Sequence, residues 1–90
     1  MMISDMAVSE QLLAILRCPE DHSRLRWASA ELVERANRLI ASGNLASRNG
    51  DPVRRPIEGG LVREAGDRFY PIYDDIPVLL PDEAIDVAVL

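Results

Sequence analysis

Residues 69–80 read FYPIYDDIPVLL, and this stretch decides the fold of the chain. Residues 69–73 are rich in aromatic and β-branched side chains, which are typical of a strand. The aspartates at 74–75 turn the chain, and the apolar run 76–80 follows. Because Pro77 has no N–H to donate to a neighbouring strand, the sequence predicts an edge strand or an extended segment here.

Upstream of this stretch, Leu61-Val62 begins another strand, and the turn residues 65–67 separate it from residues 69–73. Two strand patterns joined by a short glycine-containing turn predict an antiparallel hairpin. Leu25 and Trp27 alternate with polar neighbours and predict a further short strand. We expect the core to be supplied by the large apolar side chains Leu25, Trp27, Phe69, Ile72 and Val78.

Two helices are predicted before the hairpin. The first carries an apolar stripe at residues 12–16 and ends near Arg17, because Pro19 disfavours helical geometry just before it. The second follows Ser29, a favourable N-cap, and stops at Gly43 or Asn44. Its apolar residues recur at helical spacing at Leu32, Val33, Ala36, Leu39 and Ile40. The expected fold class is α+β in a single domain, 1–90.

Composition excludes several functions. The chain has 90 residues and a formal charge of −5, which disfavours direct binding to nucleic acid. No apolar run approaches the roughly 20 residues of a membrane-spanning helix, and no signal peptide is evident, so we expect a cytoplasmic protein with no membrane partner. Cys18 is the one cysteine, so no disulfide can form within the chain.

The two ends of the chain resemble a known family of small zinc-ribbon proteins. The matching residues form two blocks, 12–28 with Leu12-Leu13, Leu16 and Cys18-Pro19, and 60–84 with Leu61-Val62, Tyr70-Pro71-Ile72 and residues 76–80. This family includes the activator subunit of tRNA, ribosomal-RNA and release-factor methyltransferases, and short bacterial relatives. The resemblance implies a small antiparallel sheet of the zinc-ribbon type, with residues 29–58 as a helical insertion between its two halves.

The resemblance also implies that the metal ligands are largely lost. The family places two pairs of cysteines at positions that correspond here to Cys18, Asp21, Arg63 and Gly66. Structural zinc needs four thiolate or imidazole ligands, and only Cys18 is of that kind. We therefore expect no metal and no cofactor, and an ion pair between Arg63 and Asp21 where two metal-binding turns would meet.

Two patterns could carry catalysis, and each has a structural alternative. Cys18 could be a nucleophile with His22 as its base, or a partly buried thiol with no chemical role. Asp74 and Asp75 could be an acid–base pair, or solvated turn residues. The structural alternatives are favoured, so we expect no catalytic residue and no enzyme activity.

Binding is then the expected function. The sequence predicts a non-catalytic accessory module for a protein partner, with a methyltransferase as the candidate, and the alternative is a small structural domain that forms homo-oligomers. The candidate partner-binding residues are Ile76, Val78, Leu79 and Leu80. Strand alternation would put Ile76, Val78 and Leu80 on the core and Leu79 on the partner. The open alternative is that both faces of this segment are buried within the chain.

Overall fold

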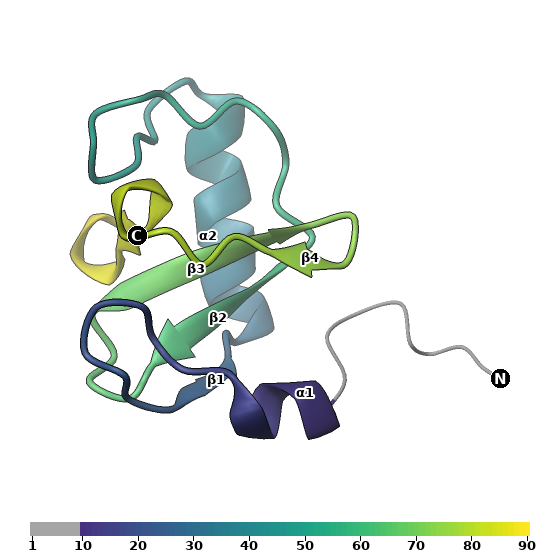
Figure 1. Ribbon diagram of the computed structural model, residues 1–90. Helices are drawn as coiled ribbons and strands as arrows, with labels where there is room; N and C mark the ends of the chain where they lie inside the picture. The colour runs from purple at the N-terminus through teal and green to yellow at the C-terminus, as the bar shows by residue number, and fades with distance from the viewer. Residues whose placement is uncertain (1–9) are drawn as a thin grey trace, which may run out of the picture.

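A five-stranded antiparallel sheet organises the chain, in a computed structural model that describes residues 10–90 (Figure 1). Its order is β1-β2-β3-β4, and β5 also pairs with β3. The strands are β1 Leu25–Trp27, β2 Gly59–Arg63, β3 Arg68–Tyr73, β4 Ile76–Pro77 and β5 Ile85–Asp86. The helices are α1 Glu10–Ile15 and α2 Ala30–Ala41, with short 3-10 turns at Pro81–Glu83 and Val87–Val89. The predicted α+β class is confirmed.

The hairpin of β2 and β3 forms the centre of the sheet, as the sequence predicts. Its register places Leu61 opposite Tyr70 and Val62 opposite Phe69. Gly60 is required here, because a Cβ atom at this position would clash with the Phe69 ring. The aromatic ring therefore packs directly on the backbone of the neighbouring strand.

Helix α2 covers one face of this sheet and lies behind it in Figure 1. The Ser29 hydroxyl accepts a hydrogen bond from the Leu32 N–H at 3.1 Å, which confirms the predicted cap. Gly43 follows the end of the helix with a φ of 76°, a conformation that glycine adopts readily. The core on this side contains Ala36, Leu45, Ile57, Val62, Phe69 and Ile85. In the chain, α2 and the loop after it come between β1 and β2, which pair with each other directly.

The other face of the sheet carries a second core, so both faces are covered. This core contains Cys18, Leu25, Leu61, Tyr70, Ile72 and Ala84, and Leu13, Leu16 and Leu79 pack against it. Leu25, Phe69 and Ile72 are buried as predicted, and Val78 is half-buried. Trp27 is not a core residue, because it ends the edge strand β1 and is 39% exposed.

The run 76–80 is oriented opposite to the prediction. The two-residue turn at Asp74 and Asp75, both with positive φ, pairs Ile72 with Pro77. Since Ile72 faces the core, the alternation places Pro77 and Leu79 toward the core as well. Ile76 and Leu80 are instead 65% and 59% exposed. Only residues 76–77 form a strand, and the Val78 N–H then donates to the Pro71 carbonyl at 2.9 Å.

Among residues 10–90, no helix is long and apolar enough to cross a lipid bilayer. The longer helix, α2, has 12 residues and an amphipathic face that packs on the sheet.

Candidate functional site

Cys18 lies in the loop that follows α1, and its thiol is at the centre of a cluster of polar side chains. Its side chain is fully buried, and its sulfur lies 3.0 Å from the Tyr70 hydroxyl. The backbone N–H of Glu20 also donates to this sulfur, at 3.4 Å. Pro19 and the turn after it position the thiol, because the His22 N–H donates back to the Cys18 carbonyl at 2.9 Å.

Arg63, at the end of β2, brings a guanidinium to the same place. Its Nη1 lies 3.8 Å from the Cys18 sulfur and 3.4 Å from an Asp21 carboxylate oxygen. Its Nε and Nη2 bind both oxygens of Asp67, at 2.6 and 2.8 Å, and this bidentate geometry is the strong form of an arginine–carboxylate pair. The structure therefore brings together Cys18, Asp21 and Arg63.

Gly66, the fourth position of the resemblance, lies in the turn between β2 and β3. Its φ is 83°, and its N–H donates to the Arg63 carbonyl at 2.7 Å. A Cβ atom there would lie 3.5 Å from an Arg26 nitrogen. Its role in this fold is that of a turn residue with a left-handed backbone.

Further ion pairs extend this cluster across the molecule. Glu20 contacts Arg63 at 3.4 Å, Arg68 at 3.3 Å and Arg48 at 2.8 Å. Asp86 contacts Arg68 at 2.9 Å and Arg48 at 3.6 Å. The network joins the loop after α1, the loop after α2, the central hairpin and β5. Sequence reasoning missed Glu20, Arg48, Arg68 and Asp86, because scattered charges in a sequence do not indicate which of them meet.

The cluster fixes the charge of its carboxylates. The Ser23 N–H, with the Cys18 thiol and the Arg63 charge as smaller contributions, lowers the pKa of Asp21 from 3.8 to about 2. The hydrogen bonds from Arg63 lower the pKa of Asp67 from 3.8 to about 2. Burial, together with Cys18, raises the pKa of the Tyr70 hydroxyl. At neutral pH both carboxylates are ionised and Tyr70 is protonated, so its hydroxyl can donate to the sulfur.

These residues do not fit a zinc ion. A structural zinc site is a closed tetrahedron of four thiolate or imidazole ligands. Here Arg63 places a fixed positive charge beside the only thiol, and its carboxylate contacts raise its pKa further. Within residues 10–90, no three His, Cys, Asp or Glu side chains come together as a set that could hold a metal ion.

The candidate catalytic patterns are not assembled as sites. The Cys18 sulfur makes its hydrogen bonds with Tyr70, Glu20 and Arg63, and none joins it to the exposed side chain of His22. Asp74 and Asp75 are exposed in the turn between β3 and β4. Asp74 pairs with Arg55 at 2.5 Å, and the Arg55 guanidinium lies over the Tyr73 ring.

The candidate partner-binding segment is divided between core and surface. Leu79 packs against the core that contains Cys18, and Val78 is half-buried. Ile76 and Leu80 are more than half exposed on either side of them. Ile76 and Leu80 thus face solvent on a segment that is held against the core by the side chain of Leu79.

Comparison with known proteins gives a structural relative. The chain is similar to the protein XF2673 from Xylella fastidiosa, whose structure was solved by NMR in solution. The two share 29% sequence identity and a TM-score of 0.69, over 89% of this chain and 82% of that one. No protein-family model and no curated protein matches the sequence.

Proposed function

We propose that this chain is a non-catalytic accessory module that binds a protein partner through Ile76 and Leu80. The observation that carries the proposal is their exposure, 65% and 59%, at the edge strand β4 and the segment after it. Leu79 holds this segment on the core, so the two side chains are presented from an ordered backbone. Burying a large apolar side chain contributes roughly 1.5–3 kcal/mol, so two exposed ones on the same segment favour association.

A methyltransferase is the candidate partner, on the basis of the family resemblance. The proximity of Cys18, Asp21 and Arg63 supports that resemblance, since the two metal-binding turns of a zinc ribbon meet in the same way. In this proposal the ion-pair network stabilises the junction that zinc stabilises in the family. Strand addition is one way in which a module binds the sheet of a partner, but β4 is only two residues long and Pro77 has no N–H, so the exposed side chains of Ile76 and Leu80 carry the contact in this proposal.

A second copy of the chain is the alternative partner. The same observation favours it, because an edge strand with exposed apolar side chains can pair with its own copy as well as with another protein. The two functions differ in which protein the segment binds. A test must therefore substitute Ile76 and Leu80 and identify the bound protein that is no longer recovered.

Affinity purification of the full chain from its native host tests the proposal. The double variant Ile76→Asp/Leu80→Asp removes the exposed apolar pair, and Val89→Asp is the matched control because Val89 is 55% exposed in a different element. We expect mass spectrometry to identify a methyltransferase with the parent and the control. The double variant should lose it and should keep its circular dichroism spectrum.

Two results would overturn the proposal. One is recovery of the same partner by the double variant in equal yield. The other is recovery of nothing but tagged and untagged copies of this chain, which would establish the self-associating alternative.

A further inference from the structure

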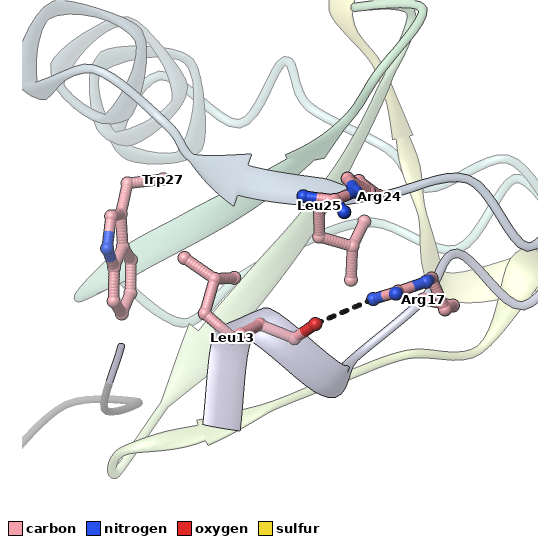
Figure 2. Close-up of a pocket in the computed structure, with 6 residues that line it drawn as sticks. Leu13, Arg17, Arg24, Leu25 and Trp27 are labelled. Atoms are coloured by element: carbon pink, nitrogen blue, oxygen red, sulfur yellow. Dashed lines mark hydrogen bonds between the residues drawn. The ribbon is translucent and has the colours of Figure 1, made fainter. Parts of the chain in front are cut away.

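A second apolar surface lies at the opposite edge of the sheet, between α1 and β1. It is a pocket of about 320 Å³ lined by Leu13, Leu25 and Trp27 together with Arg17, Arg24 and Ala14 (Figure 2). Figure 2 shows the Trp27 ring at one end of the pocket, the two arginines at the other, and Leu13 between them. Trp27 is 39% exposed, so its end of the pocket is open to solvent.

The charged side chains that line this pocket are all positive. The chain carries a formal charge of −5, yet two guanidinium groups line this pocket. Among the described side chains, four arginines form no salt bridge, and two of them, Arg17 and Arg24, line this pocket; Arg48, Arg63 and Arg68 each pair with two or more carboxylates. The pocket is therefore complementary to a ligand that combines negative charge with an apolar group.

Arg17 is held in position before any ligand arrives. Its Nη1 donates to the carbonyls of Ala14 at 2.9 Å and Leu16 at 2.8 Å, at the end of α1. A side chain that is already ordered loses less conformational freedom when it binds. Tryptophan and arginine are also the residue types that contribute most to binding at protein interfaces.

We propose that this pocket binds an acidic, apolar peptide segment of the protein partner. A leucine or phenylalanine side chain would lie between Leu13 and Trp27, and neighbouring aspartate or glutamate side chains would pair with Arg17 and Arg24. This inference rests on the proposed binding function and adds the chemistry of a second contact. Because β1 and β4 are opposite edges of the sheet, the two contacts can be tested separately.

Trp27 is the only tryptophan in the chain, so its fluorescence reports directly on the pocket. The probe is the capped peptide Asp-Glu-Leu-Phe-Asp-Glu, and the comparison peptide has lysine at every acidic position. Titration of the full chain with the acidic peptide should shift the Trp27 emission to shorter wavelength and saturate. The lysine peptide should leave the emission unchanged.

The double variant Arg17→Glu/Arg24→Glu should weaken binding of the acidic peptide by about tenfold or more. The matched control is Arg35→Glu/Arg38→Glu, which makes the same change in net charge on the exposed face of α2 and should bind within about twofold of the parent. Circular dichroism checks the fold of each variant. If the first variant does not fold, Arg24→Glu alone replaces it, since the Arg24 side chain makes none of the carbonyl contacts of Arg17.

Several outcomes would overturn the inference. Equal responses to both peptides, or equal loss of binding in both double variants, would show that the pocket does not select acidic segments. An emission shift that depends on protein concentration without peptide would assign the pocket to a second copy. If the Trp27 emission is already at short wavelength and does not change when peptide is added, the pocket is filled by another part of this chain. Recovery of the partner through Ile76 and Leu80 with no peptide binding would leave the proposed function standing and overturn only this contact.

Discussion

Arg63 joins three carboxylates and a buried thiol, and 12% of its side chain is exposed. Replacing it with alanine leaves Asp21 without its cation, removes the bidentate partner of Asp67 and opens space above Cys18. We expect Arg63→Ala to lower the free energy of unfolding by about 2 kcal/mol in a urea titration. Arg35→Ala is the control, because it removes an exposed pair within α2 and should cost less than about 0.5 kcal/mol. Equal losses in the two variants would show that the cluster does not stabilise the fold.

Acid sensitivity should follow from the same residues. The pKa values of Asp21 and Asp67 fall from 3.8 to about 2 on folding, so their contribution to stability is present above pH 3.8 and is lost as the pH falls toward 2. Urea midpoints measured across this interval should decline. Asp67→Asn should lower the midpoint at neutral pH and flatten the decline, whereas Asp82→Asn, in an exposed turn, should change neither. A decline as steep in Asp67→Asn as in the parent would contradict this assignment.

The segment 76–80 gives the clearest test at the scale of an element. Leu79 is partly buried against the core, so Leu79→Asp would remove apolar packing and partly desolvate an unpaired charge, and should destabilise the fold by about 2 kcal/mol. Ile76 is 65% exposed, so Ile76→Asp should change the free energy of unfolding by less than about 0.5 kcal/mol. Circular dichroism with urea checks both. The opposite order of stability would restore the orientation that the sequence alone predicted.

The elements differ in how well local sequence determines them. Helix α2 is marked by Ser29 and by apolar residues at helical spacing, and the hairpin by strand patterns around a glycine turn, so both were predictable. The orientation of residues 76–80 was not predictable, because it depends on the turn that pairs Ile72 with Pro77. A shift of this pairing by one residue would exchange the side chains that face the core with those that face solvent. Strand β5 was missed because two residues that pair with distant β3 leave no periodic pattern.

The candidate site was predictable only where the family resemblance indicated which positions come together, namely those that correspond to the metal ligands of the family. Arg63 and Asp21 were expected to meet, and their atoms lie 3.4 Å apart. The links through Glu20, Arg48, Arg68 and Asp86 depend on how three loops and the sheet come together, which no single stretch of sequence determines. The exposure of Trp27 likewise depends on the strand order, since the same residue in a central strand would be covered.

At the scale of the whole molecule, we propose that the exposed side chains of Ile76 and Leu80 bind another protein and not a second copy of the chain. Light scattering on the purified parent chain measures this directly. We expect a monomer of 10.0 kDa. A stable dimer that Ile76→Asp/Leu80→Asp converts to monomers, and that Val89→Asp leaves intact, would contradict it and would show that the chain uses this surface to bind itself.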